Sequence, residues 1–443
     1  MAYVRYPVAS PYRLVTALFR DRSQPADFIH YAFAQFIWRK REAKHHLLLA
    51  LAFLFWPLVF IGASLHFTRR CGAKVRKLTG KGILRQVMEQ FYCAVVHSVS
   101  PGKYYIFDLY KDERRAKAGE LIIRYEFKGG IHSLMQAWTA RKGPTTKQTL
   151  NNKVDFAIRC QKHGVEAIGV VCSVEEGGRL VWVDHPGPEL PERDLFLKPT
   201  KGKGGRGCER WDFVGNGRYR DISGKELTAA ELLAHVKELG RDKLYMVQPR
   251  AVNHPDLAGL CGAALSSMRI MSVMNDRGEP EVLFAVFKIS GRGDSVVDNF
   301  HAGGFVCKVD MATGELGAAT DWGIKEPGRW ITRHPATGAP VEGARLPLWR
   351  ETVDLVRRAH LAFADRPAVG WDVAITDQGP MIVEGNGQFG LDMVQRTHAS
   401  PAGNSRFCAL YCWHIAQALK DMYGLDATPP ALVPPALPQA SAA

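Results

Sequence analysis

From about Leu121 onward, segments whose apolar residues have the spacing of a helix alternate with segments that have the pattern of a strand. Helical spacing predicts helices over residues 149–163, 348–363 and 406–422. Short apolar runs between turn residues predict strands. These are residues 167–172, 195–198, 243–248, 267–273, 282–289, 373–376 and 381–384. Strands that alternate with helices in this way predict an α/β (α+β) fold.

The N-terminal part has a different pattern. Residues 47–65 contain no charged residue over 19 positions, which reaches the length of a membrane helix. Pro57 in the middle and basic residues on both flanks favour a re-entrant hairpin with both ends in the cytosol. A straight span and a buried helix of a soluble domain are the alternatives. The apolar, aromatic residues 28–38 predict an interfacial segment, and residues 84–96 predict a helix.

Charge separates the same region from the rest. The chain of 443 residues has a net charge of +14, and residues 1–117 hold 20 Lys/Arg against 7 Asp/Glu. Because the excess is confined to the end with the apolar run, it favours an anionic membrane surface over nucleic acid. We therefore expect three parts: a mostly helical basic region over 1–117, an α/β domain over 118–426, and a disordered Pro/Ala-rich tail over 427–443.

The cysteines indicate the compartment. Nine are present, and none forms a C-x-x-C pair or a zinc-spaced cluster. Free thiols of this kind are typical of a reducing cytoplasm. Together with the basic apolar region, they predict a cytoplasmic protein at the inner face of the membrane.

A glycine-rich loop follows the strand at 195–198. Its sequence, FLKPTKGKGGRG over 196–207, interleaves Lys201, Lys203 and Arg206 with glycines that include Gly204 and Gly205. Glycine lets backbone amides turn toward an anion, and the cations neutralise it, so the loop favours phosphate binding. It lacks the Walker pattern. A solvated basic loop is the alternative.

A second group of polar residues lies in the last pair of strands. In GWDVAITDQGPMIVEGNG, Asp372 opens one strand and Glu384 closes the next, with Asn386 two residues later. The turn residues at 377–379 predict a hairpin, which would bring these side chains together. Oxygen ligands of this type suit Mg²⁺, with Mn²⁺ as an alternative. They could instead be strand-end residues that face solvent.

Taken in order along the chain, these elements resemble the ATP-grasp superfamily. They are most similar to its sugar-transfer-associated branch, which is related to alpha-L-glutamate ligase-like proteins. The resemblance covers roughly residues 145–415, and it includes the segments YMVQPR and SSMRIMSV. It implies two α/β subdomains that clasp a nucleotide, with ATP and Mg²⁺ as cofactors.

The resemblance also implies roles for single residues. Lys153 would approach the nucleotide phosphates, Lys198 would contact the α-phosphate or the adenine side, and the loop at 201–207 would close over the β- and γ-phosphates. Val247 and Gln248 would bind adenine. Arg269 would face the γ-phosphate and an acyl-phosphate intermediate, and the metal ligands would be Asp372, Glu384 and Asn386.

Four further polar residues are candidates for substrate binding. Asn299 and His301 follow Asp298 in the segment DNFHAGG, and Asp392 and Gln395 follow the metal motif. A turn cap explains the first pair nearly as well, and surface polar groups of a helix explain the second.

The resemblance implies an ATP-dependent ligase that joins a carboxylate to an amine through an acyl phosphate. The association of the branch with sugar transfer suggests a surface-glycan or lipid-linked precursor in the cell envelope as substrate. One alternative is a kinase that phosphorylates a sugar or lipid-linked acceptor. The other is a nucleotide-binding membrane adaptor without catalysis.

Overall fold

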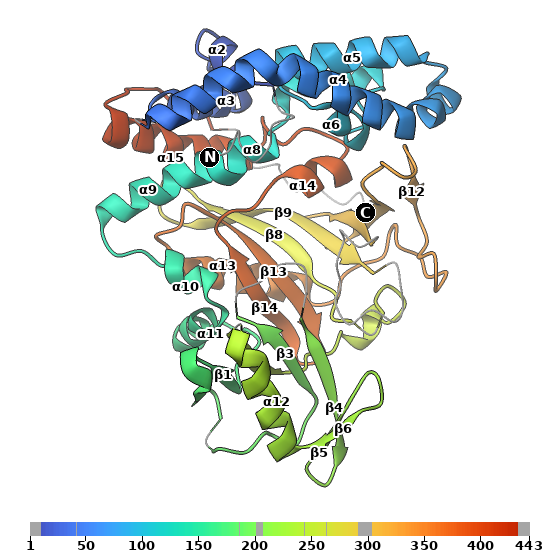
Figure 1. Ribbon diagram of the computed structural model, residues 1–443, viewed down its shortest axis with the longest axis vertical. Coiled ribbons are helices and arrows are strands. Elements are labelled where there is room, and N and C mark those ends of the chain that lie inside the picture. The colour runs from blue at the N-terminus through green and yellow to red at the C-terminus, as the bar shows by residue number, and fades with distance from the viewer. Residues whose placement is uncertain are drawn as a thin grey trace, which may run out of the picture.

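The computed structural model describes residues 10–432, except 41, 186, 201–206, 243, 263 and 291–303. A layer of helices from both ends of the chain lies over the larger of two antiparallel sheets, and the second sheet lies below the first (Figure 1). The first helices are α2 (Arg13–Thr16), α3 (Pro25–Trp38), α4 (Ala43–Thr79), α5 (Ile83–His97), α6 (Pro101–Ile106) and α7 (Asp112–Arg115). They confirm the prediction of a mostly helical N-terminal region.

The larger sheet has the strand order β12-β11-β10-β9-β8-β13-β14. Its strands are β8 (Met268–Met274), β9 (Pro280–Ile289), β10 (Phe305–Val309), β11 (Leu316–Thr320), β12 (Trp330–Ile331), β13 (Ala368–Thr376) and β14 (Gly379–Asn386). Helix α13 (Trp349–Ala362) packs on one face, while α14 (Asp392–Thr397) and α15 (Arg406–Tyr423) pack on the other. Alternate residues such as Ile270 and Met271 therefore belong to two different cores.

The second sheet has the order β2-β1-β7-β3-β4-β5-β6. Its elements are β1 (Cys172–Val174), β2 (Leu180–Trp182), β3 (Leu195–Pro199), β4 (Glu209–Gly215), β5 (Arg218–Asp221), β6 (Glu226–Thr228), β7 (Tyr245–Pro249) and α12 (Ala229–Asp242). One face packs against α12, where Leu197 and Val247 are fully buried. Because side chains alternate, Lys198 and Gln248 point to the other face.

Two backbone contacts join the sheets. The amide of Ile168 donates to the carbonyl of Ile382 on β14 over 3.1 Å, and the amide of Val171 donates to Val247 on β7 over 2.8 Å. The segment at 168–171 is thus bonded to one strand of each sheet. It sets how closely β14 approaches the second sheet.

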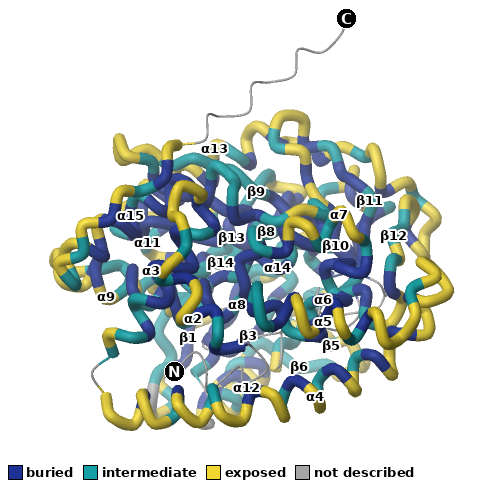
Figure 2. The backbone as a smooth tube through the Cα atoms, turned by 90° about the horizontal axis from the view of Figure 1, so that it is seen from above, coloured by how far each residue is buried: buried dark blue, intermediate teal, exposed yellow. Residues whose placement is uncertain are grey.

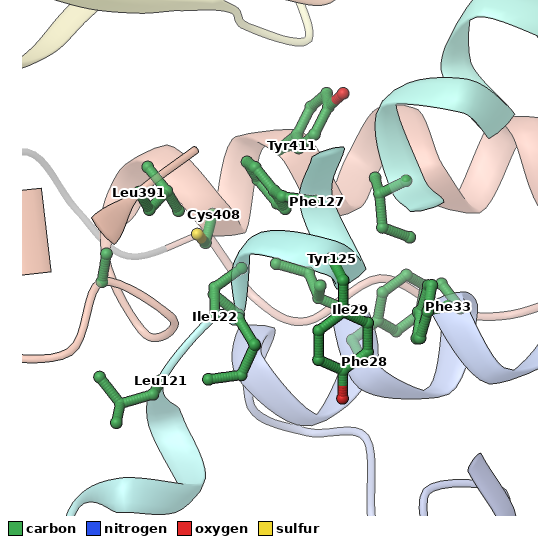
Figure 3. Close-up of a cluster of buried hydrophobic side chains, with 14 of the residues drawn as sticks. Phe28, Ile29, Phe33, Leu121, Ile122, Tyr125, Phe127, Leu391, Cys408 and Tyr411 are labelled. Carbon is green, nitrogen blue, oxygen red and sulfur yellow. The ribbon is translucent and has the colours of Figure 1, made fainter. Parts of the chain in front are cut away.

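One hydrophobic core includes residues from both sides of position 117. Phe28 and Phe33 of α3 are buried with Phe127, Leu391 and Tyr411 (Figure 3). The helices α8 (Arg124–Glu126) and α9 (His132–Lys142) extend this core toward α15. The basic N-terminal region is therefore packed into the part of the molecule that follows residue 117.

The larger sheet and the C-terminal helices confirm the sequence-based expectation, but two predicted elements differ. The helix predicted over 149–163 is divided into α10 (Lys147–Asn151) and α11 (Lys153–Lys162). Asn152 causes the break because its side chain caps α11, accepting from the amide of Val154 over 3.0 Å. The strand predicted over 167–172 is wrong in extent, since β1 begins only at Cys172 and Ala167 makes a single bridge to Ile382.

The re-entrant hairpin predicted around Pro57 is wrong. Helix α4 is 37 residues long and continues through Pro57 without a break. It is capped at its C-terminal end by Gly80, whose φ of 73° is suited to that position. Proline leaves the carbonyl four residues earlier without its helical donor. That carbonyl, on Phe53, lies 3.5 Å from the hydroxyl of Tyr12, which packs beside the helix. The interruption is thus compensated without a reversal of the chain.

The interfacial segment predicted over 28–38 is also wrong, because α3 is a core helix with Phe28 and Ile29 fully buried. Among the described residues, α4 is the one helix long and apolar enough to cross a membrane. In its apolar stretch of 18 residues, 22% of the residues are buried inside the protein.

We expect Phe33→Ala to lower the free energy of unfolding by about 3–5 kcal/mol, because Phe33 is 1% exposed in the shared core. The matched control is Phe19→Ala, since Phe19 is 84% exposed, and this change should have little effect. Urea denaturation of the full chain measures both. Equal stabilities for the two variants would show that α3 does not pack into the core.

Candidate active site

The hairpin of β13 and β14 brings two carboxylates together through a β-bulge. From the turn upward the register is regular, with Thr376 opposite Gly379 and Val373 opposite Ile382. The register then shifts by one residue: Val383 has no opposite residue on β13, and Asp372 lies opposite Glu384. Directly opposed residues point to the same face, so the bulge places the two carboxylates side by side.

A row of charged side chains continues from these two carboxylates onto the neighbouring strand β8. Arg269 of β8 lies opposite Asp372, and its guanidinium donates to both carboxylate oxygens over 2.7 and 3.0 Å. The ammonium of Lys288 on β9 lies 3.2 Å from the same carboxylate and 2.9 Å from the hydroxyl of Ser267. Burial opposes ionisation of Asp372, but the charges of Arg269 and Lys288 outweigh it and lower the pKa of Asp372.

Lys198 on the second sheet and Lys153 at the start of α11 contribute two cations beside this row. Lys198 of β3 is 9% exposed, and burial, with the nearby charge of Lys153, lowers its pKa to about 8 although Glu384 opposes the shift. Lys153 begins α11, and its ammonium lies 3.5 and 3.4 Å from the carbonyls of Pro199 and Thr200. The structure therefore brings together Lys153, Lys198 and Glu384 from two sheets and one helix.

Asn386 completes the group on β14. It lies two residues beyond Glu384, on the same face of the strand, and its amide donates to the Glu384 carboxylate over 3.1 Å. Among the described residues, no three His, Cys, Asp or Glu side chains cluster closely enough to hold a metal ion. The two carboxylates and one carboxamide still fit Mg²⁺, which commonly takes few protein ligands and completes its shell with water and phosphate oxygens.

Gln248 has a structural contact that the resemblance did not suggest. Its side-chain amide donates to the carbonyls of Ile168 and Gly169 over 3.0 and 2.9 Å, and the residue is 4% exposed. Val247 is fully buried and paired with both neighbouring strands. The side chain of Gln248 thus holds the segment that joins the sheets.

Asp392 and Gln395 are buried on α14, away from solvent. Asp392 forms an ion pair with Lys103 of α6. Gln395 accepts from the amide of Ile122 over 2.9 Å and donates to its carbonyl over 3.0 Å. These bonds attach α14 to the N-terminal region, and they give both side chains a structural role.

Several predicted site residues lie outside the described part of the chain. They are Lys201, Lys203, Gly204, Gly205 and Arg206 of the glycine-rich loop, together with Asn299 and His301.

Sequence reasoning missed Lys288 and Ser267. The signal was present, because Lys288 is the single charged residue in the apolar run VLFAVFKI at 282–289. A lysine inside such a strand needs a partner, which here is the buried carboxylate of Asp372.

The comparisons with known proteins identify the family of the chain. The model of the sugar-transfer associated ATP-grasp family matches residues 142–402, more than half of the chain, and the chain belongs to this family. Its two sheets form an ATP-grasp fold, as the sequence predicted. No curated protein matches the sequence.

Solved structures show weak overall similarity. D-alanyl-alanine synthetase A from Vibrio cholerae is 11% identical over 62% of this chain and 67% of that chain, with a TM-score of 0.35. L-amino acid ligase from Bacillus licheniformis is 15% identical over 66% of this chain and 54% of that chain, with a TM-score of 0.32. D-alanine–D-alanine ligase from Bacillus anthracis is 11% identical over 71% and 84%, with a TM-score of 0.35. The match thus spans about half the length of the L-amino acid ligase.

We expect the affinity for MgATP to be level up to about pH 8 and to fall by up to about tenfold per pH unit above it. The reason is that Lys198, whose pKa is lowered to about 8, loses its proton in the free protein, whereas a bound phosphate would retain it. Calorimetric titration between about pH 6.5 and 9.5 measures this decline.

The control is Lys198→Arg, whose guanidinium stays charged throughout this range. Its affinity should not decline in the same way. An identical decline in the variant would assign the titration to another group.

Proposed function

We propose that this protein is an ATP- and Mg²⁺-dependent ligase that joins a carboxylate to an amine through an acyl phosphate. The observation that carries the proposal is the row of Arg269, Asp372 and Glu384 across β8, β13 and β14, which faces Lys198 of β3 in a chain of the ATP-grasp family. Two sheets whose facing side chains carry an excess of positive charge suit a polyanion bound between them.

The charges of the described side chains support this ligand. Four cations, Lys153, Lys198, Arg269 and Lys288, accompany two carboxylates, Asp372 and Glu384, which leaves a net charge of about +2. MgATP carries about −2 at neutral pH. Phosphoryl transfer depends mainly on positioning and on neutralisation of charge, so this balance suits the reaction.

In the first step of the proposed reaction, a carboxylate oxygen of the substrate attacks the γ-phosphorus of ATP, and the bond to the β-phosphate oxygen breaks. The products are an acyl phosphate and ADP. Arg269 and Lys288, both within hydrogen-bond distance of Asp372, are placed to neutralise the transferring phosphoryl group. Mg²⁺ held by Asp372, Glu384 and Asn386 supplies further charge neutralisation when it is bound.

In the second step, an amine attacks the acyl carbon, the new C–N bond forms, and phosphate leaves as the amine loses a proton. We assign Lys198, on the opposite sheet, and Lys153, at the start of α11, to the nucleotide phosphates in both steps. The chain's own residues therefore orient charges and provide no covalent nucleophile.

For the substrates, we propose a surface-glycan or lipid-linked precursor at the inner face of the membrane. The family's description, which associates it with sugar transfer, supports the first part. The apolar helix α4 and the excess of basic residues over 1–117 support the second.

We expect Glu384→Gln to lower ADP release by at least about 100-fold, because it removes a charged metal ligand from the proposed site. The matched control is Asp377→Asn, which neutralises an exposed carboxylate in the turn of the same hairpin and should leave the rate unchanged. ADP release from purified protein is measured with Mg²⁺ against amino acids and sugar acids.

Undiminished turnover in Glu384→Gln would remove Glu384 from the metal site. The products distinguish the reactions. ADP formation that requires an amine supports a ligase, whereas a stable phosphorylated acceptor would instead identify a kinase.

We expect Lys288→Met to lower kcat/KM for ATP by about 10–100-fold, because it removes one of the two cations beside Asp372. The control is Lys308→Met on the adjacent strand β10, where the lysine side chain is exposed. Steady-state kinetics at saturating amine measure both variants. If the two substitutions have the same small effect, Lys288 does not act on the nucleotide.

A further inference from the structure

Helix α4 carries a line of exposed apolar side chains. Leu47, Leu51, Leu54, Leu58, Ile61 and Leu65 recur at intervals of four and three residues and are 40–69% exposed. At 3.6 residues per turn this spacing places them along one side of the helix, over about 27 Å. Figure 2 shows α4 at the edge of the molecule, with exposed segments along its length.

The other side of α4 is packed against the protein along nearly its whole length, from Leu49 to Val75. Its polar residues are bonded to α5, since Ser64 donates to Gln90 over 3.0 Å and Gln90 donates to Thr68 over 3.0 Å. Crossing a bilayer would separate these partners and expose a buried face. The helix as folded is suited to lie on a membrane surface.

The exposed apolar surface continues onto α5. Leu84, Met88, Phe91 and Tyr92 are 52–75% exposed and share one side of that helix. The ring of Phe91 contacts Phe60 of α4 edge-on, with centroids 5.4 Å apart. Phe60 belongs to the packed side of α4, so this contact places α5 directly beside α4. We call the exposed apolar side chains of the two neighbouring helices the α4–α5 apolar face.

The charged residues within α4 itself are all basic. Within its 37 residues, α4 has six Lys/Arg and no Asp or Glu. By helical spacing, Lys44, Arg69 and Arg76 continue the line of exposed leucines beyond both of its ends, and all three are exposed. A surface with an apolar centre and basic ends is complementary to a bilayer with anionic headgroups.

We propose that the α4–α5 apolar face docks in the plane of a single leaflet of an anionic membrane. Its apolar side chains enter the boundary between headgroups and acyl chains, and Lys44, Arg69 and Arg76 bind lipid phosphates. This inference deepens the membrane association within the proposed function, and it does not depend on the reaction that the site catalyses.

A second copy of the chain is the main alternative to a membrane as the partner of the α4–α5 apolar face, because intervals of three and four residues also suit a coiled coil. The charges oppose it. In either helix direction, a paired α4 would bring Lys or Arg near Lys or Arg without an acidic partner on the helix. The exposed apolar side chains on α5, which include Phe91 and Tyr92, also lie outside the single line on α4 that a two-helix seam would use.

The test is flotation of the purified full-length protein with preformed vesicles, either of phosphatidylcholine alone or with about one-third phosphatidylglycerol. We expect binding to the anionic vesicles. Leu54→Glu with Leu58→Glu should lower the partition coefficient by at least about 100-fold, about tenfold for each leucine. The matched control is Ile222→Glu with Leu361→Glu, which changes residues 67% and 53% exposed outside this face.

The charge contribution is tested separately. Arg69→Gln with Arg76→Gln should lower binding to anionic vesicles by about fivefold per residue, and it should leave the weak binding to neutral vesicles unchanged. Titration of MgATP to each variant keeps this test apart from the catalytic proposal. All surface variants should retain the affinity of the unchanged protein.

Three results would overturn the inference. The first is a protein that floats with neither vesicle. The second is a dimer, seen by analytical ultracentrifugation, that Leu54→Glu with Leu58→Glu converts to monomer without any change in vesicle binding. The third is cellular protein that resists alkaline extraction and carries its two termini on opposite sides of the membrane, which would make α4 a transmembrane helix.

Discussion

The candidate site depends on a buried carboxylate that lies between two cations. Asp372 is 7% exposed, and without Arg269 and Lys288 its burial would favour the protonated form. The three residues come from three adjacent strands, so their contact requires the register of β8, β9 and β13 together. The same carboxylate holds the guanidinium and the ammonium together on one face of the sheet. A change in the alignment of these strands would affect charge, geometry and stability at once.

The layer of helices over the larger sheet supports the strands that carry the candidate site. Phe28 and Phe33 share a core with Tyr411, and Lys103 and Ile122 hold α14 through Asp392 and Gln395. Because α14 packs on β9 and β10, the N-terminal region is mechanically connected to the sheet that carries Lys288. The layer also holds α4, so docking of the α4–α5 apolar face on a membrane would set the orientation of the whole protein relative to the lipid.

Local signals were sufficient for much of the fold. The turn residues after Thr376 and the apolar strands on either side predicted the hairpin, and Asp372, Glu384 and Asn386 are next to one another in it. The glycine-rich loop was recognised from composition, although it lies outside the described residues. Lys288 was missed because a lysine in a strand is informative only when its partner is known. The hairpin at Pro57 was predicted wrongly because proline alone does not reveal that Tyr12 lies beside the carbonyl it leaves without a donor.

The sequence by itself determined the periodicity of the elements, the basic and apolar character of the N-terminal region, and the residue types of the site. These follow from side-chain chemistry and from spacing along the chain. Only the tertiary structure decided that Val383 bulges so that Glu384 opposes Asp372, that Lys288 joins them, and that α4 is buried on one side and exposed on the other. Each of these depends on contacts between segments far apart in the chain, and such contacts leave no regular pattern in the local order of residues.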